Sequence, residues 1–423
     1  MWGEASLGGK RAERLWWNFT MFGSDIALFS LGLSISSAYT VLPLFAQHLT
    51  ANNVAIAAIP AIRALGLYAP QLLVAPLTER LRHVKPFLLA VTVLERVPYL
   101  ILALAALWLA SDHPGWLLAI FFLLLLIALG AGGVTYPGWL DMIARSIPSR
   151  WLGRFMGLWV GLGNLLGIGG AALAAAILAG IGWPGNFALC FALTFAAMVI
   201  SFVMLALGRE PARPQVAARA EAPGTPAQLR ALWKLVRADA ALRRLLVGNA
   251  LVGVSTMAAA LYAVAAVREG GLSDAQVGIE STVLFVAMTA GYFLWGAVGD
   301  RFGHRAVLMW GSLCAALSAV LALGARGIVA YGVVFLLLGL NLAATGLAGF
   351  TLITEFGPPA RRPTYVALAS IAYAPFVIGA PLVAGVIANV WGYAPVFVLT
   401  ALTGVLAALA FRRWVPDPRA ARD

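Results

Sequence analysis

The chain contains twelve apolar runs, each of about the length that a helix needs to cross a membrane. A helix spans roughly 30 Å of hydrocarbon with about 20 residues. Lipid offers no partner to backbone polar groups, so runs of this kind form helices rather than open strands. The runs cover residues 19–46, 55–77, 86–110, 116–140, 154–181, 187–207, 245–266, 276–298, 306–325, 329–353, 364–388 and 393–412. The sequence predicts an all-α polytopic membrane protein with twelve transmembrane helices, of which the first and fifth are long enough to tilt or to extend past the bilayer.

The composition excludes a water-soluble globule. Hydrophobic residues make up 62% of the chain and charged residues only 11%, whereas soluble domains carry about 25% charged residues. The two cysteines, Cys190 and Cys314, lie far apart inside apolar runs, so no disulfide framework is expected.

The basic residues predict the orientation in the membrane. Of the 29 lysines and arginines, all but four fall in segments on the side of the N-terminus. Arg268 and Arg326 lie in loops on the opposite side, and Arg63 and Arg96 lie inside apolar runs. By the positive-inside rule both termini are cytoplasmic, and the protein lies in the cytoplasmic (inner) membrane. The net charge of +12 then comes from cytoplasmic loops and does not indicate a nucleic-acid partner.

One long polar segment, residues 208–244, divides the chain into an N-terminal half (1–207) and a C-terminal half (245–423) with six spans each. Its second part, residues 225–237, has apolar positions at the period of a helix, which predicts an amphipathic helix on the membrane surface. The alternative is a solvated linker whose periodicity arose by chance.

The two halves resemble each other in sequence. Residues 49–56 match residues 272–279, and residues 148–158 match residues 358–368. The offsets of these pairs, 223 and 210, agree to within small insertions, which indicates duplication with parallel halves.

A charged loop between the eighth and ninth runs carries the most specific motif. Gly296 begins a G-x3-D-R-x-G-x-R pattern that continues with Asp300, Arg301, Gly303 and Arg305. The pattern, at this position among twelve spans, resembles the cytoplasmic loop signature of the major facilitator superfamily of secondary transporters. The resemblance implies two six-helix halves that work by alternating access, with Asp300 and Arg301 as conformational-switch residues. The alternative is a solvated turn that only fixes the topology.

The first half carries an incomplete copy of this loop. Glu79 and Arg80 keep the acid and the arginine, but Ala75 and Arg82 stand where the glycines belong. We therefore expect an asymmetric latch, carried mainly by the second half. Two further cytoplasmic charge clusters are predicted, at Asp141, Arg145, Arg150 and Arg154 and at Glu355, Arg361 and Arg362.

Four charged residues lie deep inside predicted spans, where each should face protein or a wet cavity. Asp25 lies at a depth similar to that of Glu95 and Arg96, so these three residues can form a cluster. Asp25 or Glu95 is a candidate proton-coupling carboxylate, and Arg63 is a candidate anion-binding or gating cation. The alternative for each is a structural ion pair between packed helices. Glu280 is expected near the outer surface, solvated or capping a helix.

Other polar and aromatic residues near mid-membrane are candidates for lining the transport path. If the chain has the superfamily architecture, the set is Tyr136, Asn164, Tyr262, Asn341 and Tyr373. Packing, or hydrogen bonding between helices, is the alternative for each. The low charge of this set favours an amphiphilic or weakly charged substrate.

Enzymatic chemistry finds no support in the sequence. The four histidines lack metal-ligand spacing, and no phosphate-binding loop or G-x-S-x-G motif is present, so no metal and no cofactor is expected. The finer resemblance is to uncharacterised prokaryotic permeases of the superfamily, in Asn18-Phe19, residues 40–44 and Leu94-Glu95-Arg96.

These residues predict a monomeric transporter of a small solute. We expect proton coupling, with efflux of an amphiphile competing with uptake. The alternative is a membrane sensor or lipid-handling protein on the same fold without coupled transport.

Overall fold

A computed structural model describes residues 9–79, 81–211, 236–356 and 362–417, and all regular structure in these ranges is helical. Eleven of the described helices are long and apolar enough to cross a membrane. The seventh predicted span is also helical but consists of two shorter helices, α9 and α10. The predicted fold class, with twelve transmembrane segments, is therefore confirmed.

Within each half the helices follow one another with short connections. In the first half they are α1 (Gly9–Ile35), α2 (Val41–Leu49), α3 (Asn53–Glu79), α4 (Lys85–Leu109), α5 (Pro114–Ser146), α6 (Ser149–Gly180) and α7 (Gly185–Leu207). In the second half they are α9 (Ala240–Ser255), α10 (Leu261–Arg268), α11 (Asp274–Phe302), α12 (His304–Ala322), α13 (Gly327–Phe356), α14 (Arg362–Trp391) and α15 (Tyr393–Leu409). A π-helical turn, η3 (Ala410–Trp414), continues α15. Most of the predicted amphipathic helix at 225–237 lies outside the described residues.

Helix α11 shows how local sequence sets these boundaries. The hydroxyl of Ser273 accepts a hydrogen bond from the Gln276 backbone at 3.3 Å, and the Gln276 side chain accepts one from the Ser273 backbone at 2.8 Å. This reciprocal capping box satisfies two donors that the first helical turn would otherwise leave unpaired. The helix ends at Gly303, whose φ of 85° is readily available only to glycine. Helix α12 then begins at His304, so the charged loop is a tight turn.

The chain forms two compact units, which we describe separately. Unit 1 comprises residues 1–36, 66–170 and 183–223, and unit 2 comprises residues 37–65, 171–182 and 224–423. Unit 2 thus combines three segments: α2 with the start of α3, the last turns of α6, and the second half of the chain.

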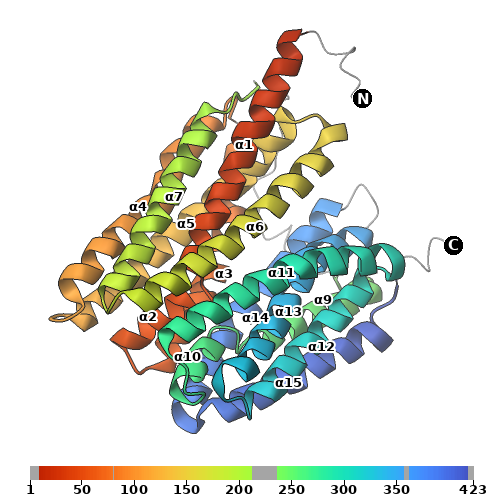
Figure 1. Cartoon of the computed structure of the whole chain (residues 1–423). Coiled ribbons are helices and arrows are strands. Elements are labelled where there is room, and N and C mark those ends of the chain that lie inside the picture. Colours follow the sequence, from red (N-terminus) through yellow and green to blue (C-terminus); the bar gives the residue numbers. More distant parts are fainter. Residues whose placement is uncertain (1–8, 80, 212–235, 357–361, 418–423) are drawn as a thin grey trace. The chain divides into compact units, whose positions relative to one another are not determined.

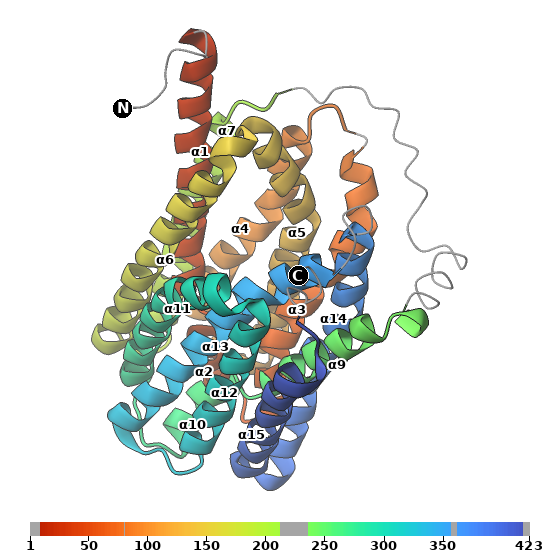
Figure 2. The same cartoon turned by 90° about the vertical axis from the view of Figure 1, so that its right-hand side faces the viewer.

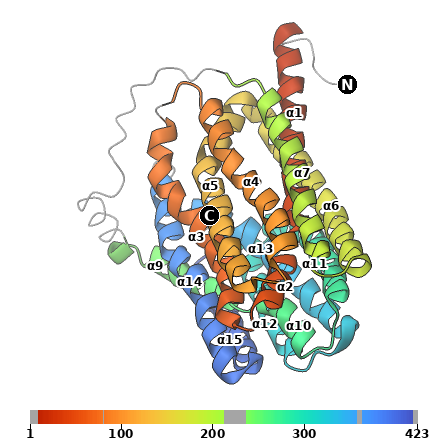
Figure 3. The same ribbon diagram turned by 90° about the vertical axis from the view of Figure 1, so that its left-hand side faces the viewer.

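In unit 1, α1 packs along α7, and α4 packs against both α5 and α7 (Figures 1 and 3). One apolar core of this unit joins α1, the start of α4, the end of α5, α6 and the end of α7. Its buried side chains are Leu15, Phe19, Phe22, Val84, Leu88, Met142, Ile143, Ile147, Phe155 and Leu205.

In unit 2, α13 packs between α11 and α12, and α15 packs against α12 and α9 (Figure 2). We call the end of unit 2 that carries residues 300–305 and 411–415 the inner end, following the predicted orientation. There Arg305 donates hydrogen bonds to the carbonyls of Phe411 and Arg412. We call the end that carries residues 48–53, 268–274 and 389–393 the outer end.

Candidate functional site

The first span of each half is interrupted at an equivalent position. Helix α1 ends at Ile35 and α2 begins at Val41, while α9 ends at Ser255 and α10 begins at Leu261. The two breaks, residues 36–40 and 256–260, are separated by an offset of 220 residues, which agrees with the internal repeat. Interrupted helices at matching positions of two repeats are the pointer to a transporter's binding site.

This interruption corrects the expectation of an unbroken, tilted first span over residues 19–46. Hydroxyl side chains favour the break, since they offer the backbone alternative hydrogen bonds, and here the Tyr39 backbone donates to the Ser37 hydroxyl at 3.3 Å. The Ser36 hydroxyl bonds to Thr194 on α7 at 2.7 Å. The Thr40 hydroxyl bonds to Ser281 on α11 at 2.8 Å, within unit 2.

The second break is a series of tight turns. The backbone of Met257 donates to Val254 at 3.0 Å, and the backbone of Leu261 donates to Ala258 at 2.8 Å. These bonds reach back three residues instead of the four of an α-helix. Just after the break, Tyr262 is buried, bonds to Ser318 at 3.2 Å and stacks on Phe397.

A cation and two phenol rings lie beside the first break. Arg63 on α3 donates to the Tyr39 hydroxyl at 2.6 Å, and its guanidinium carbon lies 5.4 Å from the centre of the Tyr39 ring. Tyr292 on α11 lies within electrostatic range of both residues. The Arg63 side chain is exposed, and a charged side chain within a span is tolerated where it meets water or protein rather than lipid.

In unit 1, the structure brings Asp25, Glu95 and Arg96 together. One Nη atom of Arg96 lies 3.2 Å from a Glu95 oxygen, and the other lies 3.9 Å from an Asp25 oxygen. The three residues are between 4% and 7% exposed. We call them the buried charge cluster.

Hydroxyl and indole groups complete this cluster. Glu95 accepts hydrogen bonds from Thr92 at 2.7 Å and from Thr135 on α5 at 2.5 Å. Asp25 accepts from Ser201 on α7 at 2.6 Å and from the Trp139 indole on α5 at 3.2 Å. The cluster therefore ties together α1, α4, α5 and α7.

Arg96 is fixed on all sides. It donates to the Met198 carbonyl at 2.7 Å and to the Thr92 carbonyl at 2.9 Å. The rings of Phe29 and Phe202 lie 5.7 and 5.5 Å from its guanidinium carbon. With both carboxyls ionised, the cluster has one positive and two negative charges, a net charge of −1 in a buried site.

The outer end of unit 2 is joined by a polar network that the sequence did not reveal. Arg268 donates to Asn53 at 2.9 Å and to the Tyr393 hydroxyl at 3.1 Å. Asn389 accepts from the Asn53 backbone at 2.7 Å. Residues from both halves of the chain meet in these bonds, and we call them, with the pair described next, the outer lock.

A histidine–carboxylate pair extends the outer lock. His48 at the end of α2 lies 2.5 Å from Asp274 at the start of α11. The internal repeat over residues 49–56 and 272–279 marked these two loops as equivalent, and it was the one sequence signal that could have found the lock.

The loop Gly296–Arg305 lies at the inner end of unit 2. Asp300 and Arg301 are exposed, and the Arg301 guanidinium packs over Phe302. His304 pairs with Glu355 on α13 at 2.7 Å. Residues 296–302 lie within α11, so Gly303 alone separates this helix from α12. The Glu79 side chain and Arg80 lie outside the described residues.

A further charged network, in unit 1, centres on Glu210. Its carboxylate accepts from the backbones of Val84 and Lys85, each at 2.9 Å, and so caps the start of α4. Arg145 bridges Glu210 at 2.8 Å and Asp141 at 2.9 Å. The predicted charge cluster at Asp141 and Arg145 therefore includes Glu210, a linker residue that the sequence did not single out.

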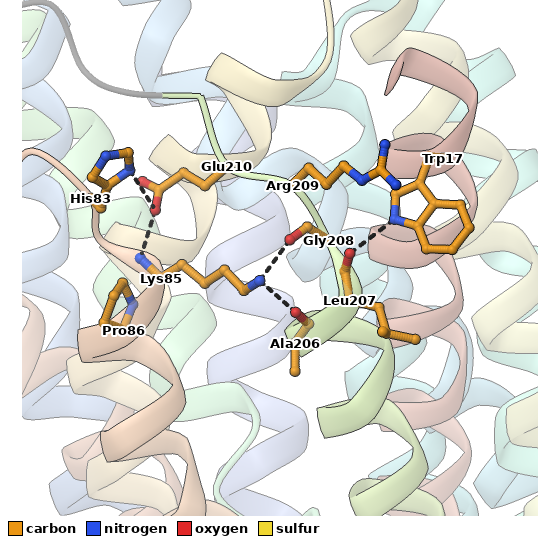
Figure 4. A pocket seen from close by; sticks show the side chains of 9 residues that line it. All are labelled: Trp17, His83, Lys85, Pro86, Ala206, Leu207, Gly208, Arg209 and Glu210. Atoms are coloured by element: carbon orange, nitrogen blue, oxygen red, sulfur yellow. Dashed lines mark hydrogen bonds and ion pairs between the residues drawn. The ribbon is translucent and has the colours of Figure 1, made fainter. Parts of the chain in front are cut away.

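Lys85 also joins the start of α4 to the end of α7, because its amine donates hydrogen bonds to the carbonyls of Ala206 and Gly208 (Figure 4). Beside these bonds lies a pocket of about 500 Å³. It is lined by Trp17, His83, Lys85, Pro86, Ala206, Leu207, Gly208, Arg209 and Glu210.

Comparison with known proteins decides the family. The family model described as Major Facilitator Superfamily matches residues 25–268 and 245–423. The chain belongs to this superfamily. It is therefore a membrane transporter protein, as the loop signature predicted.

Two curated relatives match part of this superfamily member. A candidate niacin/nicotinamide transporter of Bacillus subtilis, NiaP, is 26% identical over 149 residues, which are 35% of this chain and 37% of the relative. A candidate transporter of Caenorhabditis elegans, svop-1, is 29% identical over 154 residues, 35% of this chain and 28% of the relative. The matches thus span only about a third of each relative's length.

Solved transporters share the fold over nearly the whole chain. A point mutant of the nucleoside transporter NupG gives a TM-score of 0.69 at 14% identity and covers 94% of this chain and 99% of its own. A D-xylose–proton symporter gives 0.65 at 16% identity, with 96% and 98% covered. At these identities the likeness shows the fold of this superfamily and not the substrate.

The candidate path residues of this transporter have varied surroundings. Tyr136 is exposed and stacks on Trp139, which donates to Asp25. Asn341 is buried and donates to the Gly311 carbonyl at 2.9 Å. Asn164 is half-buried on α6, and Tyr373 packs against Gly253. The structure therefore gives Tyr136 a place next to the buried charge cluster and gives Asn341 a packing partner.

Proposed function

We propose that this superfamily member is a secondary active transporter that moves a small solute by alternating access and is driven by protons. The buried charge cluster is the observation that carries the proposal. Arg96 can neutralise only one of the two carboxylates, Asp25 and Glu95. A net charge of −1 is costly in a buried site, so uptake of one proton is favoured there.

The outer lock supports alternating access. It joins α3 of the first half to α10, α14 and α15 of the second, and α2 to α11, through hydrogen bonds. Water can replace such bonds, because a protein hydrogen bond contributes only about 1 kcal/mol net. The lock can therefore open and close at modest cost.

The inner counterpart in this proposal is the loop Gly296–Arg305. Arg305 and His304 hold it to the inner end of unit 2. Asp300 and Arg301 are exposed at the same turn, which supports their assignment as conformational-switch residues. Glu79 and Arg80 are assigned the same role in the first half on sequence grounds alone.

The residues beside the first break favour a small aromatic carboxylate as substrate. Arg63 offers a guanidinium that can bind a carboxylate, and Tyr39 and Tyr292 offer rings on which an aromatic ring can stack. Such a compound is amphiphilic and carries one charge, in line with the sequence-based expectation. The name of the Bacillus subtilis relative, which includes niacin, points to the same chemistry.

For the location and orientation of the protein in the membrane, we propose what the sequence predicts. The protein lies in the cytoplasmic membrane with both termini inside, because the basic residues concentrate in the segments on that side. We also keep the sequence-based expectation of a monomer.

Transport in proteoliposomes tests the coupling. Radiolabelled nicotinate is offered with and without an imposed pH gradient. The wild type should accumulate it only with the gradient, whereas Asp25→Asn and Glu95→Gln should lose accumulation and keep exchange of labelled for unlabelled solute. Asp112→Asn, at an exposed acid outside the helices, is the control. Gradient-driven accumulation that survives in both variants would remove the cluster from the coupling mechanism.

Thermal stabilisation tests the substrate class. Nicotinate at a hundred times its dissociation constant should stabilise the protein by about 2.7 kcal/mol, and nicotinamide, which lacks the carboxylate, should stabilise it far less. Arg63→Gln should abolish the difference. Stabilisation by lipids alone, with no solute exchanged, would instead favour a lipid-handling or sensor protein on this fold. The direction of the gradient that drives transport distinguishes efflux from uptake.

A further inference from the structure

Helix α11 carries a carboxyl group that is buried without a partner. Glu280 is 1% exposed, and neither of its carboxyl oxygens has a hydrogen-bond partner in the described part of the chain. The expectation that this side chain is solvated or caps a helix is therefore wrong. Nearly two turns of α11 separate Glu280 from the helix start, and its side chain faces a neighbouring helix instead of water.

That neighbour is α13, at Gly332. A β-carbon at Gly332 would lie 3.4 Å from a Glu280 carboxyl oxygen, so the glycine leaves room for the carboxyl between the two helices. The next residue of α11, Ser281, bonds to Thr40 in the first break at 2.8 Å. Glu280 thus sits beside the contact that joins α11 to the broken first span.

The elements packed around this part of α11 supply no charge to balance an ionised Glu280. No side chain of the described residues donates a hydrogen bond to its carboxyl. The titratable groups on α10, α13 and α2 are engaged elsewhere: Tyr262 bonds to Ser318, Arg268 to Asn53, Tyr331 packs against Gly270, and His48 pairs with Asp274. Glu269 is exposed after α10, and residues 171–180 of α6 contain no titratable side chain.

An ionised carboxylate without partners is strongly disfavoured in such a site, whereas a protonated one is tolerated. We infer that Glu280 is a proton-binding site that locks the outer end: it takes up a proton from the outer medium as this end closes, and releases it before this end opens. The inference rests on the alternating access proposed above. It assigns Glu280 a site separate from the buried charge cluster, which lies in unit 1 and contains its own arginine.

The sign of the pH effect follows from this assignment. The closed outer end holds one proton more than the open one, so acid favours closure and alkali favours opening. For a single proton the ratio of closed to open protein changes at most tenfold per pH unit. Glu280→Gln mimics the protonated acid and should remain closed at every pH. Glu280→Asp keeps a titratable group and should keep the pH dependence.

Distance measurements between two spin labels on the full-length protein in lipid nanodiscs test the inference. The labels are placed on Ala51 and Trp391, two exposed residues of the outer end, with Cys190 and Cys314 replaced by alanine. The wild type should shift from short to longer distances as the pH rises from 5 to 8. Glu280→Gln should change its ratio of closed to open protein less than twofold over that range. A wild-type pH response in Glu280→Gln overturns the inference.

Two further readouts separate this inference from the proposed function. Asp25→Asn should keep the pH response of the outer end, since Glu280 is intact. If Asp25→Asn abolishes the response and Glu280→Gln keeps it, proton coupling stands and the Glu280 site is rejected. If the distances never change in any variant, alternating access and the Glu280 site both fail. Infrared spectra should show a protonated carboxyl band that Glu280→Gln removes, and the absence of such a band also rejects the site.

Discussion

Arg96 on α4 and Asp25 on α1 are 3.9 Å apart, and the hydroxyl of Ser201 on α7 bonds to both. Ser201 donates to Asp25 at 2.6 Å and accepts from Arg96 at 3.2 Å. The pair is therefore a relay across three helices as well as an ion pair. A change in the charge of Asp25 alters its hydrogen bond with Ser201 on α7. Protonation of Asp25 is thereby linked to the packing of this helix.

Replacing Arg96 by methionine should destabilise the protein strongly. Two buried carboxylates would lose the cation that pairs with both, and breaking a buried pair costs about 3–5 kcal/mol. This cost is measured by unfolding the protein in a mild detergent to which increasing fractions of a denaturing detergent are added. The same substitution in the background of Asp25→Asn and Glu95→Gln should cost much less. An equal cost in both backgrounds would assign the effect to packing against Phe29 and Phe202 instead.

Arg268→Gln should open the outer lock. The guanidinium holds Asn53 and Tyr393, and hydrogen bonds to a charged group are worth about 1.5–3 kcal/mol. The ratio of closed to open protein should fall roughly tenfold to hundredfold. The readout is the rate at which a membrane-impermeant maleimide labels Ser281→Cys, since Ser281 is fully buried in the closed outer end. Arg326→Gln, in another loop on the same side, is the matched control and should leave the rate unchanged.

Glu210→Gln should lower the stability of unit 1 without changing any residue of the proposed transport path. The carboxylate caps two backbone N–H groups at the start of α4 and pairs with Arg145. Loss of these charge-assisted bonds should cost about 1–3 kcal/mol. Thermal unfolding measures the change, with Asp112→Asn as the exposed control. Identical melting temperatures for Glu210→Gln and the wild type would show that the network carries no net stability.

Tyr262→Phe separates packing from substrate binding. The Tyr262 hydroxyl bonds to Ser318 inside unit 2, so its removal should cost about 0.5–1.5 kcal/mol of stability. Because the ring is buried against Phe397, affinity for solutes should not change. A fall in nicotinate affinity with unchanged stability would place Tyr262 in the transport path after all.

Features governed by the cost of polar groups in lipid were predictable from the sequence. The spans followed from the length of the apolar runs, and Asp25, Glu95 and Arg96 stood out because charges there are expensive. Their partners Thr92, Thr135 and Ser201 did not stand out, since hydroxyl residues are common in spans and only the packed helices show which ones meet.

The breaks and the Glu210 network could not be predicted from the sequence, for different reasons. Residues 36–40 are only mildly polar, so the hydropathy of the first apolar run shows no interruption at these positions. Glu210 is one carboxylate in a charged linker, and nothing in its surroundings marks it as a helix cap. The burial of Glu280 depends on Gly332, which lies 52 positions further along the chain and becomes its neighbour only in the fold.

The matching breaks also carry information about descent. The sequence match indicates that the halves arose by duplication, and on that interpretation an interruption at the same place in both is inherited from a six-helix ancestor. Two copies of that ancestor, paired around a twofold axis, would have presented identical breaks to each other. In the present chain the first break reads Ser-Ser-Ala-Tyr-Thr and the second Thr-Met-Ala-Ala-Ala. The two breaks have thus diverged since fusion: the first carries hydroxyl side chains, and the second is mainly alanine.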